Sequence, residues 1–266
     1  MQDRTLTLDF AERWLRDGIS VCRPPAFSQS LEVDMTRAKH LLDIAKGRGI
    51  RLTYTHLIVR AAALVLAANP ELHVLVCGAR RRFPAQVDIG LSLAGDMFLT
   101  PVLIIADAAR KSLRAIAEEI TRRTPEAQEE SRAFAARLRR WGPLIPFGFL
   151  RRALLRILGA SFSFRRKGSG TFQVSIVPGV DRFDTPLFNT SAILAAGAVR
   201  ERVVAVNGVP AVGCTVWLTC SADHRVWNGS ACETFLLRIR EILQGSTLED
   251  EFAAEATAKF AHVRYE

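Results

Sequence analysis

The amino-acid sequence predicts an α/β fold, in which helices pack on a mixed β-sheet to form a two-layer sandwich. Segments with the alternation or short apolar runs of strands occur along the chain together with segments of helical periodicity. The two kinds do not alternate strictly, which favours a mixed sheet over a doubly wound parallel one. Of the 266 residues, 49% are hydrophobic, enough to bury a substantial core. We interpret residues 1–266 as a single domain.

The elements of the first half follow from local patterns. Residues 30–35 alternate like a half-buried strand, and Thr36 is a candidate cap for a helix that runs to about Lys46. His56–Ala68 is apolar nearly all round, which is typical of a buried helix. It should end before Pro70, because the residue ahead of a proline disfavours the α region. Three strands are expected next, over residues 74–77, 87–93 and 100–105.

The second half contains one clear helix start and one clear hairpin. Ser112 is a candidate cap for a helix over 113–120, whose apolar residues recur at the spacing of one helical face. Asn207-Gly208 stands between residues 203–206 and 209–212, which is a strong hairpin signal. The remaining expected elements are strands over 171–177 and 215–221 and a helix over about 229–243.

The positive charge of the chain is concentrated in one segment. The formal net charge is +9, and residues 132–167 hold ten arginines and lysines without any aspartate or glutamate. The rest of the chain therefore sums to about −1. A partner for the basic charge has to be sought at this segment. These residues are Arg132, Arg137, Arg139, Arg140, Arg151, Arg152, Arg156, Arg165, Arg166 and Lys167.

Cysteine usage and the apolar runs indicate the class of protein. The five cysteines show neither metal-ligand spacing nor a disulfide framework, so we expect reduced thiols, a cytoplasmic protein and no metal. The N-terminus has no apolar stretch of the secretory type. No apolar run reaches the roughly 18 residues that cross a bilayer.

One histidine stands in a pattern that suits chemistry. Residues 223–229 read Asp-His-Arg-Val-Trp-Asn-Gly and lie between an apolar strand and an apolar-faced helix. At such a junction the backbone is held firmly while the side chain can face a crevice. A histidine there can take a proton from a thiol or hydroxyl and return it later. An isolated loop histidine is more often a surface or core residue, so the surrounding sequence decides.

This stretch resembles the His-x-x-x-Asp/Asn-Gly signature of dihydrolipoyl acyltransferases, the core component of 2-oxoacid dehydrogenase complexes, and of chloramphenicol acetyltransferase. Other blocks resemble the same family in the same order, among them the Asn-Pro-Glu-Leu ending of 52–73 and the Gly-Thr-Phe-x-x-Ser strand of 170–180. The resemblance covers roughly residues 26–245. It implies the fold of coenzyme A-dependent acyltransferases and a homotrimer with active sites between subunits.

The resemblance also implies roles for three residues. His224 matches the general base that acts on the thiol of coenzyme A or on the acceptor. Ser175 matches the serine whose hydroxyl stabilises the tetrahedral oxyanion. Asn228 matches the position that orients the site around the histidine. The implied reaction moves an acyl group between coenzyme A, or a phosphopantetheine carrier, and a small-molecule or carrier-borne acceptor, without a metal.

The sequence departs from the family pattern at four places. It has no recognisable lipoyl domain, so we expect no covalently bound lipoyl group in this chain. Residues 176–178 replace the usual Asn-Leu-Gly after the serine, and residues 189–191 replace a Pro-Pro turn, which suggests a different acceptor. A basic insert over about 132–167 lengthens one connection. A charged tail over 246–266 extends past the usual end and could fold back on the insert.

Three interpretations remain for residues 137–159, where arginines and large apolar residues are interleaved. Pro143 and Pro146 predict two short helical pieces. Their apolar side could pack on the trimer, or they could form an amphipathic surface for an anionic membrane or a long acyl chain. They could instead dock an acidic carrier protein or the phosphates of coenzyme A. Nucleic acid fits poorly, because no known binding motif accompanies the charge.

The leading hypothesis is therefore a stand-alone acyltransferase that uses coenzyme A or acyl-coenzyme A as substrate. One alternative is a dihydrolipoyl acyltransferase core that works with lipoyl domains supplied in trans. The other, from a different class, is a non-catalytic trimeric scaffold. An acyl carrier protein is a further possible partner.

Overall fold

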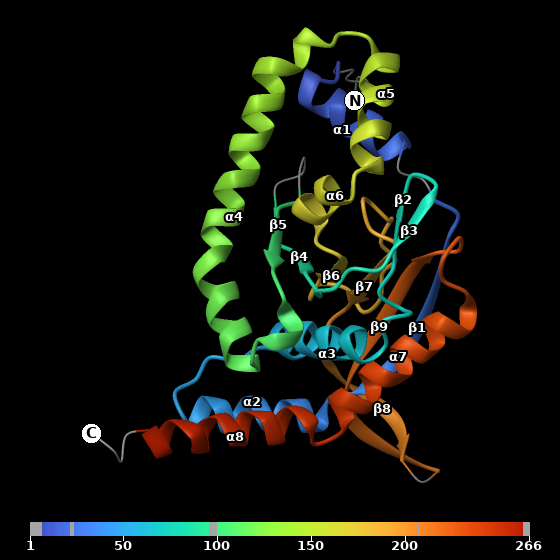
Figure 1. Cartoon of the computed structure of the whole chain (residues 1–266). Coiled ribbons are helices and arrows are strands. Elements are labelled where there is room, and N and C mark those ends of the chain that lie inside the picture. Colours follow the sequence, from blue (N-terminus) through green and yellow to red (C-terminus); the bar gives the residue numbers. More distant parts are fainter. Residues whose placement is uncertain (1–6, 22–23, 96–99, 207, 263–266) are drawn as a thin grey trace, which may run out of the picture.

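The computed structural model describes residues 7–21, 24–95, 100–206 and 208–262. Strands form the centre, and helices lie on one face and at both ends (Figure 1). The helices are α1 (Phe10–Val21), α2 (Thr36–Gly47), α3 (Tyr54–Ala68), α4 (Leu113–Trp141), α5 (Gly148–Ala160), α6 (Phe162–Ser169), α7 (Gly229–Gln244) and α8 (Thr247–His262), with short 3₁₀ turns η1 (Ala108–Arg110) and η2 (Gly142–Leu144). The strands are β1 (Ala26–Asp34), β2 (Leu75–Cys77), β3 (Arg80–Arg82), β4 (Ile89–Ser92), β5 (Val102–Ile105), β6 (Phe172–Ile176), β7 (Ala192–Ala196), β8 (Arg200–Val206) and β9 (Val209–Asp223).

The main sheet is mixed, as the sequence predicted. Its strand order is β1-β9-β7-β6-β4-β5, and β8 pairs with β9 off this path. Strand β6 runs parallel to both β4 and β7, while the other pairs are antiparallel. The short strands β2 and β3 form a separate ribbon.

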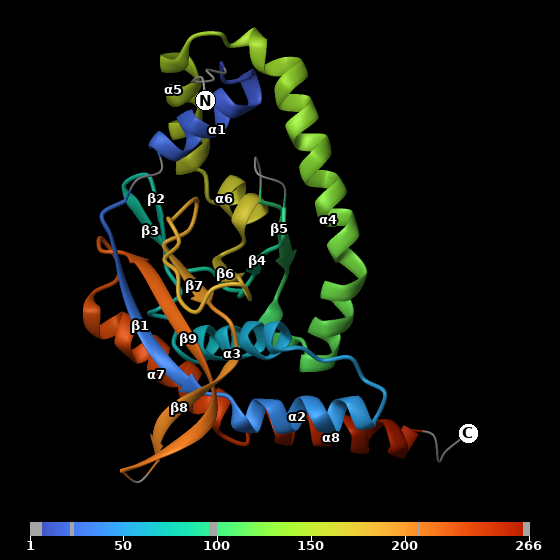
Figure 2. The ribbon, with the colours of Figure 1, turned by 180° about the vertical axis from the view of Figure 1, so that it is seen from behind.

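One face of the sheet carries the apolar core. Successive residues of a strand point to opposite faces, and residues paired across strands point to the same face. The pairing register therefore places Val174, Leu194 and Leu218 on one side, and all three are fully buried. They belong to the same apolar cluster as Leu57 of α3 and Phe235 of α7. Helices α3 and α7 lie on this side of the sheet (Figure 2).

Helix starts and ends followed the expected chemistry, with one exception. Helix α3 ends at Ala68, ahead of Pro70, and Ser112 caps α4 by accepting a hydrogen bond from the Ala115 N–H at 3.3 Å. Thr36 was expected to cap α2, and this prediction was wrong. Thr36 is the first helical residue, and the carboxylate of Asp34 accepts its N–H at 2.8 Å. The aspartate offers the stronger acceptor two residues earlier.

Two elements are longer than the sequence indicated. Helix α4 continues past the expected 113–120 to Trp141, through Pro125. The residues after that proline are mostly alanine, glutamate, glutamine and arginine, whose helix propensity is high. The expected hairpin forms from β8 and β9, and its second strand, 209–212, continues without a break through the expected strand 215–221 as β9. Asn207 of the hairpin turn lies outside the described residues, and Gly208 has a positive φ of 80°.

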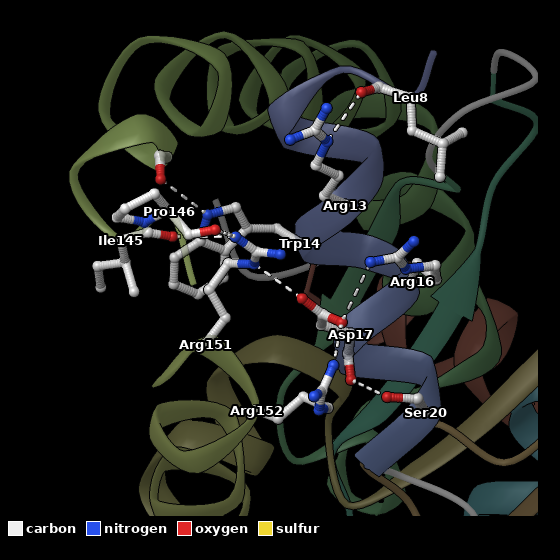
Figure 3. Close-up of polar contacts among 11 residues, drawn as sticks. Leu8, Arg13, Trp14, Arg16, Asp17, Ser20, Ile145, Pro146, Arg151 and Arg152 are labelled. Atoms are coloured by element: carbon white, nitrogen blue, oxygen red, sulfur yellow. Dashed lines mark hydrogen bonds and ion pairs between the residues drawn. The ribbon is translucent and has the colours of Figure 1, made fainter. Parts of the chain in front are cut away.

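Helix α1 was not predicted, and it packs against the basic insert. Asp17 of α1 is buried and accepts hydrogen bonds from Arg151 Nε at 2.7 Å and Arg152 Nη1 at 3.2 Å (Figure 3). Arg151 is equally buried and also donates to the carbonyl oxygens of Ile145 and Pro146. The inner side of the insert therefore packs on the N-terminal helix of its own chain.

Replacing Asp17 by asparagine should destabilise the protein by about 3–5 kcal/mol, because it leaves the buried guanidinium of Arg151 without a countercharge. Burial would by itself raise the pKa of Asp17, but the hydrogen bonds from Arg151 and Arg152 outweigh it and lower that pKa. Chemical denaturation checks the effect. Asp9→Asn is the matched control: its carboxylate pairs with Arg139 at a solvent-exposed position and should cost at most about 1 kcal/mol. Equal losses in both variants would contradict the prediction.

The outer side of the insert exposes large apolar residues. Trp141, Leu144, Phe147 and Phe149 are each more than half exposed, between 55% and 73%. They surround the end of α4, turn η2 and the start of α5, at the end of the molecule farthest from α2 and α8 (Figure 1). Pro143 and Pro146 do break the helical path there, as predicted, giving η2 and then α5.

Over the described residues the acidic tail does not fold back on the insert, which its charges had left open as a possibility. It forms α8, which lies beside α2 (Figures 1 and 2). Glu251 accepts from Arg60 Nε at 3.0 Å, and Glu249 lies 3.5 Å from both Arg37 and His40. Leu248 and Phe252 are buried, so apolar contacts fix the position of α8 together with these ion pairs.

Two negative expectations concern the same described residues. None of their helices combines the length and apolar character that crossing a membrane requires. They include no cluster of histidine, cysteine, aspartate and glutamate of the kind that holds a metal ion. Cys77, Cys220 and Cys232 are buried free thiols, whereas Cys22 lies outside the described residues.

Candidate active site

His224 is the residue that directly follows β9. Its backbone N–H donates to the carbonyl oxygen of Pro25 at 2.8 Å, which ties it to the start of β1. Its ring packs at a tilt against Phe27, with 4.9 Å between the ring centroids. The side chain is exposed. The imidazole is therefore held on one side and open to a partner molecule on the other.

The loop that carries His224 is held rigidly by its neighbours. The buried carboxylate of Asp223 accepts hydrogen bonds from Arg225 Nε at 2.9 Å and Nη2 at 2.6 Å. The carbonyl oxygen of Asp223 accepts from the N–H groups of Val226 and Trp227. Trp227 is 1% exposed and packs edge-on against Phe235 of α7. These contacts anchor the backbone on both sides of the histidine.

Asn228 serves as the N-cap of α7. Its Oδ1 accepts the Ala231 N–H at 2.8 Å, and its backbone oxygen accepts the Cys232 N–H at 3.1 Å. Both contacts fix the start of α7 relative to the histidine loop. The expected role of Asn228 in orienting the site around His224 stays a prediction, since these contacts are with α7.

Ser175 lies on a face of the sheet lined by hydroxyl groups. The pairing register aligns Ser92, Ser175, Ala195, Thr219 and Ser30 in one row across five strands, so their side chains share a face. This is the face opposite the apolar core. The hydroxyls of Ser30 and Thr219 are 2.9 Å apart, and Ser175 is 8% exposed.

Ser175 and His224 of one chain do not meet. Ser175 aligns with Thr219 through Ala195, and His224 lies five residues farther along the chain, past the end of β9. At about 3.3 Å per residue, their backbone positions are roughly 16 Å apart along the strand direction alone. They occupy opposite ends of the same sheet. A single chain cannot place both on one reacting group.

The start of β6, the strand that carries Ser175, is fixed by a buried polar group at Thr171. Thr171 Oγ1 accepts the Asp88 N–H at 2.9 Å and lies 2.7 Å from Nε2 of the buried His73. Gly170 precedes it with a φ of 72°, and a Cβ there would lie 2.5 Å from the Asp88 carbonyl oxygen. Only glycine allows this close approach of β6 to β4. The Gly-Thr pair thus sets the register that places Ser175.

Acidification should weaken the fold through His73. Burial lowers the pKa of His73 to about 4, from the ordinary 6.5. Between these values the unfolded chain binds a proton at His73 and the folded chain does not, so stability falls as the pH drops from 6.5 to 4. The loss approaches roughly 3 kcal/mol. Denaturation across this pH range should show a shallower pH dependence in His73→Gln than in the wild type, while His40→Gln, at an exposed position, should match the wild type.

Among the described residues, neither of the two most prominent cavities is lined by Ser175 or His224. The larger, about 540 Å³, lies between α4, β5 and α6 and mixes Arg123 and Arg166 with Glu126 and Glu130. The smaller, about 170 Å³, lies between α5, α6 and the core and includes Arg225, the neighbour of His224. No local sequence pattern indicates a role for Arg225 or Phe27, because their roles depend on tertiary contacts with Asp223 and His224.

The chain matches the model of one protein family, described as the catalytic domain of 2-oxoacid dehydrogenases acyltransferase. The match covers residues 20–135 and 169–249. Both Ser175 and His224 lie inside it. The unmatched residues 136–168 hold the end of α4, α5 and most of α6, and most of α1 also lies outside the match. The two unmatched parts pack on each other.

Individual relatives and solved structures agree with this family match. The chain is 28% identical to the dihydrolipoyllysine-residue succinyltransferase component of the 2-oxoglutarate dehydrogenase complex of Bartonella vinsonii subsp. berkhoffii, over 80% of this chain and 46% of that protein. It thus spans about half the length of this relative.

Among solved structures, the Azotobacter vinelandii dihydrolipoamide acetyltransferase matches with a TM-score of 0.68 at 17% identity, over 91% of each chain. A chloramphenicol acetyltransferase matches with a TM-score of 0.50 at 13% identity, over 91% of this chain and all of the other. These likenesses confirm the expected fold. By fold and by sequence, the chain belongs to the family of acyltransferase catalytic domains of the 2-oxoacid dehydrogenases.

Proposed function

We propose that this chain is an acyltransferase that moves an acyl group between coenzyme A, or a phosphopantetheine carrier, and a small-molecule or carrier-borne acceptor. His224 takes the proton from the attacking thiol or hydroxyl, which then adds to the thioester carbonyl carbon. The hydroxyl of Ser175 donates to the oxyanion of the tetrahedral intermediate. Collapse of the intermediate expels the thiolate, which takes the proton back from His224.

The observation that carries the proposal is the placement of the two residues. His224 presents an open imidazole on a rigid loop, and Ser175 lies at the other end of the hydroxyl-lined face. One active site therefore needs His224 of one subunit and Ser175 of another, as in the homotrimer that the family resemblance implies.

An exposed apolar hairpin supports association of the chains. Val203 of β8 and Val212 of β9 are directly paired, and they are 75% and 72% exposed. The hairpin projects beyond the body of the sheet (Figure 2). A paired apolar surface of this kind is typical of a surface that another chain covers.

A relative of known structure gives further support to the residue assignment. The Azotobacter structure belongs to a study of a serine, a histidine and an asparagine in the catalytic mechanism of that enzyme. In that protein the asparagine follows the histidine by four positions, as Asn228 follows His224 here. Asn228 would then hold the histidine loop through the start of α7, as its capping contacts support.

Partners belong to the same proposal. A lipoyl domain or an acyl carrier protein would deliver the acyl group in trans, and the trimer would provide three equivalent sites.

Residues 137–159 would touch an anionic membrane surface with their exposed aromatic residues and arginines. Co-sedimentation with vesicles should then retain more protein on anionic than on neutral lipid. Equal binding to both, or to neither, would contradict the membrane contact.

Thiol release from a panel of acyl-coenzyme A thioesters, from short to long chain, tests the donor. The wild type should release free coenzyme A slowly by hydrolysis and faster with a suitable acceptor. If wild type and His224→Ala gave the same background release across the panel, coenzyme A thioesters would not be the donors. Acyl-lipoyl domains and acyl carrier proteins would then be tested in the same way, and inactivity with all of them would favour the scaffold alternative.

A further inference from the structure

The smaller cavity is built by both the insert and the family core. Leu155, Arg156, Gly159 and Ala160 of α5 and Arg165 of α6 line one side. Val76, Gly78, Asn189, Thr190 and Arg225 belong to the other side, with Val21, Pro24 and Leu187 completing it. The five insert residues all lie in 136–168, which the family model does not match. One side of this cavity is therefore built by residues outside the matched family core.

The lining of the cavity is cationic. It includes Arg156, Arg165 and Arg225 and no aspartate or glutamate. Arg225 is paired with the buried Asp223 carboxylate, which leaves Arg156 and Arg165 without an acidic partner in the described part of the chain. Arg81 of the neighbouring ribbon donates to the carbonyl oxygen of Arg225 at 3.0 Å, which brings a further guanidinium close.

Arg165 has unused hydrogen-bonding capacity at this cavity. Its side chain is 92% buried, since only 8% is exposed, and one terminal nitrogen donates to the carbonyl oxygen of Val76. Its Nε–H is buried without a hydrogen-bond partner in the described structure. Buried charged donors are normally satisfied, and a guanidinium matches the oxygens of a phosphate group. Because Arg165 lines the cavity, its guanidinium offers positive charge and donor capacity to an anion there.

We propose that this cavity is a phosphate-binding pocket and that it takes the phosphate group of a pantetheine-bearing acyl donor. This assignment rests on the proposed function for the identity of the donor. The cavity has a volume of about 170 Å³. Since one water takes about 30 Å³, this volume suits one phosphate group together with a few waters. Arg225, which lines the cavity, directly follows His224, so the cavity adjoins the loop that carries the proposed general base. The same phosphate occurs in coenzyme A and in a carrier protein's prosthetic arm.

Calorimetric binding to the intact chain tests the pocket without any turnover. The ligands are coenzyme A, 4′-phosphopantetheine and pantetheine, which lacks the phosphate. The variants are Arg156→Gln and Arg165→Gln. Arg137→Gln is the matched control, because it removes the same charge from an exposed position on α4 outside the cavity. Arg156 is also exposed, so its replacement should leave the fold intact and decides the test if Arg165→Gln does not fold.

We expect Arg156→Gln and Arg165→Gln to weaken binding of both phosphorylated ligands by about 10-fold or more, since charged hydrogen bonds are lost. Pantetheine should bind all proteins weakly and equally, and Arg137→Gln should match the wild type. Similar affinities of the wild type for the two phosphorylated ligands would point to a carrier-protein donor. Tighter binding of coenzyme A than of 4′-phosphopantetheine would point to free coenzyme A as the donor. Undiminished binding in Arg156→Gln, or an equal loss in Arg137→Gln, would overturn the pocket. Turnover with coenzyme A thioesters would then still uphold the proposed function.

Discussion

Replacing His224 by alanine should lower kcat for acyl transfer by about 10²–10⁴-fold, the usual contribution of a general base. The ring is exposed, and within the described part of the chain its aromatic contact is with Phe27, so its loss should leave the fold and the assembly intact. The loop is also held by the His224 N–H bond to the Pro25 carbonyl oxygen and by the side-chain bonds between Arg225 and Asp223, and the substitution removes neither. The steady-state rate of thiol release with a competent donor and acceptor checks the effect.

His40→Ala is the matched control for that experiment. His40 is also exposed, on α2, and its ring lies 3.5 Å from Glu249 rather than at a strand end. It should retain wild-type kcat. Size-exclusion chromatography should give the same assembly for all three proteins. A His224→Ala protein that keeps full activity, or loses it only because the assembly falls apart, would contradict the role of a general base.

Most of the sheet and its covering helices could be predicted because local patterns determine them. The apolar run of α3 and the Asn207-Gly208 turn signal are visible within a few residues. Helix α1 could not be predicted in this way. Its buried Asp17 makes sense only with Arg151, which is 134 residues away along the chain. The position of α8 depends in the same way on Arg60.

The sequence nominates residues for the candidate site, but it does not show how they are arranged in space. The sequence motif singles out His224, Ser175 and Asn228, yet only the strand register shows that the first two occupy opposite ends of one sheet. The motif likewise gives no sign that Asn228 caps α7. The arginine-lined cavity joins α5, α6 and the loop after His224, so no local pattern could have revealed it.

Replacing Ser175 by alanine should lower kcat by about 10²–10³-fold, the usual effect of removing one oxyanion donor. Ser175 is nearly buried among strand neighbours, and alanine fits wherever serine does, so the fold should persist. Ser30→Ala is the matched control. Ser30 lies in the same row of hydroxyls but three strands away, on β1, and should keep most of the activity.

Mixed trimers of the two inactive variants should recover activity. If each site takes His224 from one subunit and Ser175 from the next, co-expressing His224→Ala and Ser175→Ala chains at equal levels restores a site wherever an intact histidine meets an intact serine. Random assembly makes this about one quarter of all sites, so kcat per chain should return to about one quarter of the wild-type value. Wild type mixed equally with the double variant, His224→Ala with Ser175→Ala, should also give about one quarter of the wild-type kcat per chain. If each site lay within a single chain, the same mixture would give about one half. Mixtures of the single variants that stay inactive would show that no active site is shared between subunits.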